Sequence, residues 1–141
     1  MPKRLPLLYC QRWLLLTWLV GSIPAVLFMA TRSFAGVFLG KEQEIWGWFL
    51  PTFLPTLSLI IGSYAAIALK EPSRAITVDR FFFYISLGLS AFYLLTLTTV
   101  IVCQPFLDAP ALVTMQRASL VLGVIQGLTT ACLGVFFVSQ E

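Results

Sequence analysis

The residues able to do chemistry are few in this chain and lie far apart in the sequence. It has 141 residues with no histidine, and its cysteines are Cys10, Cys103 and Cys132. Without histidine, bis-histidine haem ligation, the commonest zinc sites and imidazole acid–base catalysis are excluded. The scattered cysteines form no Cys-x-x-Cys pair and are expected to be reduced thiols. We therefore expect no catalytic residue, no metal site and no cofactor.

The charged residues are equally restricted in their placement. Lys and Arg number 9, Asp and Glu number 6, and none lies deep inside an apolar run. Proton- or cation-coupled carriers usually keep an ionisable group within the membrane. Glu42, Glu44 and Asp108 lie in connecting segments, where solvated boundary charges are the ordinary interpretation. Attraction of cations to a pore mouth is the functional alternative.

Four long apolar runs must position these residues. They cover residues 13–30, 45–69, 81–103 and 118–138. Each is close to the roughly 20 residues that a helix needs to cross about 30 Å of hydrocarbon. The sequence therefore predicts an all-α integral membrane protein. Because the connections are short, we expect one domain over residues 1–141, a bundle of four transmembrane helices in up-down antiparallel order.

Basic residues at the ends of these runs predict the orientation. Six basic residues lie in the N-terminal segment and second connection, against three in the first and third connections: Lys3, Arg4, Arg12, Lys70, Arg74 and Arg80 against Arg32, Lys41 and Arg117. Basic residues favour the cytoplasmic side. We expect a multi-pass protein of the cell membrane with both termini cytoplasmic and an uncleaved first span. The bilayer, rather than a nucleic acid, explains the net charge of +3.

The second apolar run contains two prolines. Pro51 and Pro55 share one helical face with Ser58, Gly62 and Ala66. We place Pro51 in the first helical turn, where a missing N–H costs little. Pro55 lies deeper and is expected to kink the span. Close helix packing is one interpretation of this face, and a bend that forms a gate is the other.

The fourth run carries the clearest stripe of small and polar residues. At 100° per residue one arc contains Ser119, Gly123, Gln126, Gly127, Thr130 and Gly134. Helices in lipid associate where small residues let backbones approach and polar side chains find partners. Packing within the chain, a subunit interface and a hydrated path all fit this stripe. In a pore, the candidate lining would be Gln126, Thr130, Thr96 and Thr99.

Helix ends are signalled at two connections. Thr77 or Ser73 is expected to cap the third helix. Asp108 followed by Pro110 predicts that the fourth helix begins well before its apolar portion.

These features favour a non-enzymatic membrane protein that assembles with other chains. It would form a homo-oligomeric pore or channel, or serve as a membrane subunit of a larger complex. One alternative is a carrier for a neutral or lipophilic solute. Another is a lipid-modifying membrane enzyme, in which Tyr64, Tyr93 or an interfacial carboxylate would have to act without histidine.

Overall fold

The computed structural model describes residues 4–69 and 76–137, and it is dominated by helices. They are α1 (Leu7–Phe34), α2 (Glu42–Ala68), α3 (Arg80–Cys103) and α4 (Ala111–Phe137), with one 3-10 turn, η1 (Gln104–Phe106). Within the described ranges, these four helices are long and apolar enough to cross a membrane. The prediction of an all-α fold with four helices of membrane-spanning length and hydropathy is confirmed.

Three of the helices extend beyond the apolar runs from which they were predicted. α1 begins at Leu7 and α2 at Glu42, and both starts precede the apolar run. α4 begins at Ala111, directly after Pro110, which confirms the early start. Polar residues continue the helical hydrogen bonds outside hydrocarbon, so hydropathy identifies only the central part of each helix. Lys3, Lys70, Arg74 and the predicted end at Val138 lie outside the described residues.

The cap of α3 differs from the expectation. The carboxylate of Asp79 accepts a hydrogen bond of 3.0 Å from the backbone N–H of Phe81. The prediction of Thr77 was wrong, because Thr77 belongs to a short strand that ends at Asp79. Ser73, the other predicted cap, is not among the described residues.

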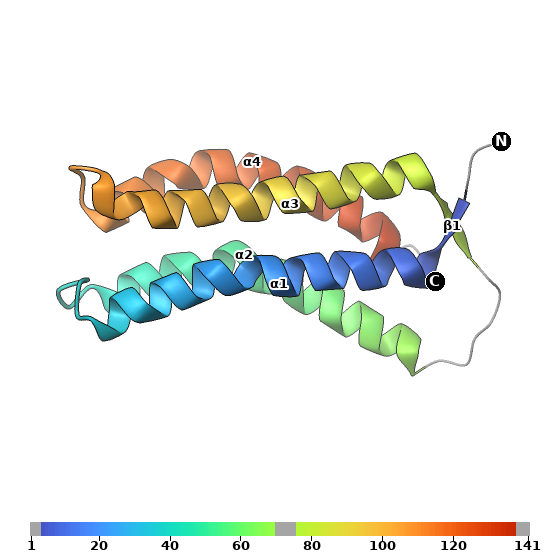
Figure 1. The fold of residues 1–141 in the computed structure, drawn as a ribbon, viewed down its shortest axis with the longest axis horizontal. Coiled ribbons are helices and arrows are strands. Elements are labelled where there is room, and N and C mark those ends of the chain that lie inside the picture. Colours follow the sequence, from blue (N-terminus) through green and yellow to red (C-terminus); the bar gives the residue numbers. More distant parts are fainter. Residues whose placement is uncertain (1–3, 70–75, 138–141) are drawn as a thin grey trace.

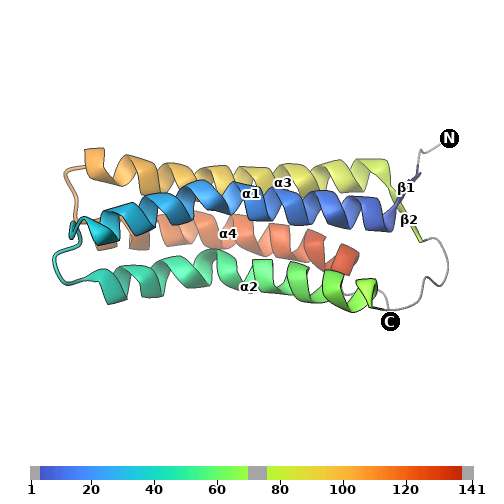
Figure 2. The same cartoon turned by 60° about the horizontal axis from the view of Figure 1, so that its bottom comes forward.

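A two-stranded antiparallel ribbon was not predicted. It joins β1 (Arg4–Pro6) to β2 (Thr77–Asp79), with Leu5 opposite Val78. Figures 1 and 2 show this ribbon at one end of the molecule, while the α1–α2 and α3–α4 connections lie at the other end. The ribbon therefore ties the start of α1 to the start of α3.

The interior is built mainly where α1 meets α3 and where α4 meets α3 and α2. The rings of Trp18 and Tyr93 are buried and stacked, with centroids 5.7 Å apart. A Cβ built on Gly21 would lie 2.7 Å from Cδ1 of Leu94. A side chain at Gly21 would therefore force the end of the Leu94 side chain to shift where α1 and α3 approach each other.

Candidate functional site

An open groove between α2 and α4 brings predicted residues of both helices together. Its volume is about 280 Å³. α2 contributes Gly47, Trp48, Pro51 and Thr52, and α4 contributes Ser119, Leu122, Gly123 and Gln126. We call this the α2–α4 groove. We call the predicted stripe on this helix (Ser119, Gly123, Gln126, Gly127, Thr130 and Gly134) the α4 stripe. The groove brings Pro51, predicted as part of a gate, next to three members of the α4 stripe.

One side-chain hydrogen bond connects the two walls of the groove. The indole Nε1–H of Trp48 donates to Oγ of Ser119 at 2.7 Å. The Ser119 hydroxyl in turn donates to the carbonyl of Met115 in its own helix, at 3.1 Å. Trp48 therefore has a polar partner, and the indole fixes the spacing of α2 and α4 at this point.

The glycines of the α4 stripe do not contact another helix of the chain. Gly123 and Gly127 are exposed, and Gly134 is half-buried. A Cβ built on any of the three would meet no atom within 4 Å, apart from its own helix backbone. At Gly21, by contrast, a built Cβ would meet the side chain of Leu94 on α3. The surface at Gly123 and Gly127 is therefore open, and no described segment of the chain covers it.

Gln126 lies in the floor of this surface without a polar partner. Its side chain is half-buried and forms no hydrogen bond to another residue within 4–69 or 76–137. An amide that is neither hydrated nor bonded is costly in an apolar medium. Thr130, one turn further along α4, is also half-buried but does not line the groove.

One of the prolines removes a helical hydrogen-bond donor at the same groove. α2 begins at Glu42 and continues through Pro51 and Pro55. Placing Pro51 in the first turn was therefore wrong, since the helix starts well before the apolar run. A proline inside a helix cannot donate to the carbonyl four residues earlier. Pro51 consequently leaves the carbonyl of Gly47, another groove residue, without its helical donor.

The remaining residues of the α2 face lie outside the groove. Pro55, Ser58, Gly62 and Ala66 are all exposed. Gly62 resembles the α4 glycines in having open space around a built Cβ. This part of α2 is a second surface of small residues that no described segment covers.

The four candidate pore-lining residues are not brought together within one chain. Gln126 lines the groove, whereas Thr96 and Thr99 belong to α3. Their hydroxyls donate to the carbonyls of Phe92 and Leu95 in their own helix, at 2.8 and 2.7 Å. Threonines bonded in this way need no partner from another helix.

Sequence reasoning missed one buried amide. Gln11 is 0% exposed, and its Nε2 donates to the carbonyl of Phe136 at 2.8 Å. Its Oε1 is buried with no partner among the described residues. The predicted first span started at residue 13 and so excluded Gln11. The spacing of Leu7, Leu14 and Trp18 is the signal that places it on the buried face.

Each of the two tyrosines considered for lipid chemistry forms a hydrogen bond to another helix. The Tyr93 hydroxyl, inside the bundle, donates to the backbone carbonyl of Thr52. That carbonyl lies three residues before Pro55, in the turn that the proline disturbs. The Tyr64 hydroxyl accepts from Nε of Arg12 at 3.0 Å. Across the part of the chain that the structure describes, no three Cys, Asp or Glu side chains are placed to hold a metal ion.

In comparison with known proteins, no family model, curated protein or solved structure matches the chain.

Proposed function

We propose that the chain is a non-enzymatic membrane subunit that assembles with copies of itself through the α2–α4 groove and the α4 stripe. The observation that carries this proposal is the open surface at Gly123 and Gly127, with the unbonded amide of Gln126 between them. Small residues and a polar side chain on one helical face are the usual means by which helices associate in lipid.

A second copy supplies what the groove lacks. Its backbone would approach at Gly123, where there is no side chain to hold it away. Its polar groups would bond the Gln126 amide and the Gly47 carbonyl that Pro51 leaves free. Both gains are available only on association, because in the single chain these groups face lipid or the open groove.

We place the four helices in up-down antiparallel order, with both termini cytoplasmic. The ribbon supports this order, because β1 and β2 must lie on the same side of the membrane to pair. Two crossings, α1 and α2, then separate the strands. The N-terminal segment and the second connection, which lie on that side, carry the excess of basic residues, and this favours the cytoplasm for it. Pro51 and Pro55 are proposed as a kink that lets α2 adapt to a neighbouring subunit.

Mass determination in lipid nanodiscs tests self-association. We expect a defined oligomer, and we expect the double substitution Gly123→Leu and Gly127→Leu to give monomers. The matched control is Gly88→Leu on α3, since Gly88 is also exposed with no atom near a built Cβ. A monomer in the unmodified protein, or equal loss of assembly in both variants, would contradict the proposal. Recovery bound to a different membrane chain would instead indicate a subunit of a larger complex.

A pore formed by several copies is the second candidate. It is favoured by the unbonded Gln126 amide, with Thr130 one turn away on the same helix. Flux of small ions from liposomes tests it. Gln126→Leu should lower the flux per assembled oligomer, whereas Thr99→Val should not. Flux that is unchanged in Gln126→Leu liposomes excludes this lining.

A further inference from the structure

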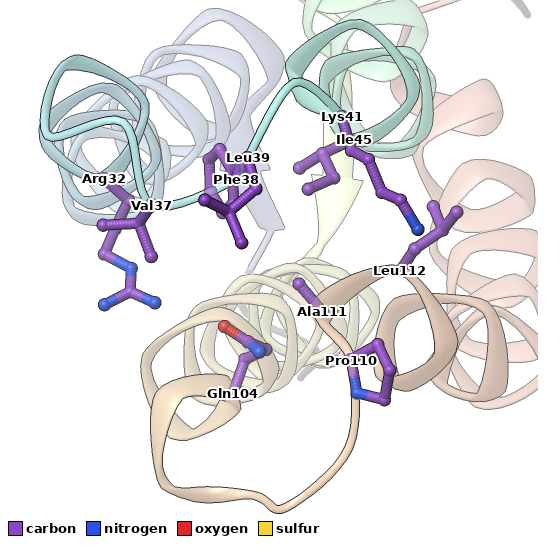
Figure 3. Close-up of a pocket in the computed structure, with 10 residues that line it drawn as sticks. All are labelled: Arg32, Val37, Phe38, Leu39, Lys41, Ile45, Gln104, Pro110, Ala111 and Leu112. Carbon is purple, nitrogen blue, oxygen red and sulfur yellow. The ribbon is translucent and has the colours of Figure 1, made fainter.

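A separate pocket at the connection end of the molecule has the chemistry of an anion site. It has a volume of about 220 Å³. Figure 3 shows that its walls come from the end of α1, the following turn, the start of α2, η1 and the start of α4. It shares no lining residue with the α2–α4 groove.

Two cationic side chains line this pocket. Arg32 is half-buried, and its Nε is buried without a hydrogen-bond partner in the described ranges. Lys41 is exposed and lies on the other side of the hollow, where its flexible stem can turn towards a ligand. Glu42 and Glu44, in the first turn of α2, and Asp108, before α4, are not among the lining residues. The charged residues that line the pocket are both cationic, which favours an anion.

The first turn of α4 adds backbone donors. The first helical bond runs from the N–H of Thr114 to the carbonyl of Pro110, at 3.1 Å. The N–H groups of Ala111 and Leu112, which line the pocket, precede this bond and have no helical acceptor. The positive end of the helix dipole lies at the same place.

Gln104 is the independent sign that a ligand belongs here. It is 9% exposed, yet its side chain forms no hydrogen bond to another residue that the structure describes. Figure 3 shows the amide directed into the hollow, towards the space between Phe38 and Ala111. The Gln104 amide opens onto the pocket, so its donor and acceptor are accessible to a ligand there. A ligand oxygen in the pocket would accept from its Nε2.

We propose that this pocket binds a phosphate oxyanion, the group that an anionic lipid headgroup shares with free phosphate. Arg32 and Lys41 neutralise its charge, while Gln104 and the α4 N-terminus donate to its oxygens. Val37, Leu39 and Leu112 add an apolar rim beside these donors. This rim gives a lipid an advantage over the free anion, because its glycerol and first methylenes have apolar surface to contact.

Titration of the detergent-purified protein at low salt tests the proposal. The probes are dioctanoyl phosphatidic acid, inorganic phosphate and dioctanoyl glycerol, which has no phosphate. We expect saturable binding of phosphatidic acid and none of dioctanoyl glycerol. Binding of inorganic phosphate with equal affinity would identify a free-anion site and still support the oxyanion chemistry. If neither phosphate-containing ligand binds, or if dioctanoyl glycerol binds as tightly as phosphatidic acid, the proposal is overturned.

Substitutions assign the binding to this pocket. Arg32→Gln and Gln104→Leu should each weaken phosphatidic acid binding about tenfold, the order expected for loss of a hydrogen bond to a charged group. Lys41→Gln should act in the same direction, and it tests the site even if the buried variants fail to fold, because Lys41 is exposed. Arg117→Gln is the matched control, an exposed cation on α4 that does not line the pocket. Equal weakening by Arg117→Gln and Lys41→Gln would show only unspecific charge attraction.

Discussion

The side-chain amide of Gln11 donates to the backbone carbonyl of Phe136, joining the first turns of α1 to the last turn of α4 at 2.8 Å. The carbonyl of Phe136 accepts this bond from a fully buried side chain near the other end of the sequence. This bond closes the bundle at the end where the ribbon lies.

Replacement of Gln11 by methionine should destabilise the bundle by about 1–2 kcal/mol, since a similar volume is kept while the carbonyl of Phe136 loses its donor. Unfolding in detergent by added dodecyl sulfate measures the change. Gln116→Met is the control, because Gln116 is exposed on the same α4. Equal effects of the two substitutions would show that the Gln11 bond contributes nothing specific.

Tyr93→Phe should cost about 1 kcal/mol, because it removes the hydroxyl that bonds the Thr52 carbonyl but keeps the ring stacked on Trp18. The exposed Tyr9→Phe is the matched comparison. Amide hydrogen exchange adds a local test. The N–H groups of α2 around Thr52 should exchange faster in Tyr93→Phe, and an unchanged pattern there would argue against this bond.

Gly21→Leu should strongly destabilise the fold, by about 2 kcal/mol or more, because the new side chain would overlap Leu94 where α1 and α3 approach. Gly21→Ala should cost less, since the nearest atom is the end of a side chain that can shift. Gly88→Leu should be nearly neutral. Thermal denaturation of the three variants in one detergent gives the ranking, and a neutral Gly21→Leu would contradict this contact.

Cysteine labelling tests the proposed orientation. Cys103 is exposed at the end of α3, whereas Cys10 is buried. With cytoplasmic termini, a membrane-impermeant maleimide added to intact cells should modify Cys103. The variant that keeps Cys10 alone should label only after denaturation. Modification of Cys103 only after the cells are opened would reverse the topology.

The sequence was sufficient to predict the helices because their signal is local and long. Apolar runs of about 20 residues have few other stable solutions in a bilayer. The ribbon was missed since its strands have three residues each and pair across a long stretch of chain. Such a pairing leaves no periodic pattern in either segment.

Only one helical face of the candidate site could be predicted from the sequence. Helical periodicity places Gly123, Gln126 and Gly127 on one side of α4, but it does not say which element lies opposite. That depends on how α2 and α4 pack, and Trp48 bonding to Ser119 sets their spacing. The phosphate pocket was beyond sequence reasoning for the same reason, because Arg32 and Gln104 belong to different connections.

The pairing of β1 with β2 imposes an order on biosynthesis. Leu5 emerges from the ribosome early, but its partner Val78 is made only after α1 and α2 have been synthesised. The N-terminal strand therefore stays unpaired until residues 77–79 have been synthesised. The ribbon can close only after both α1 and α2 have been made.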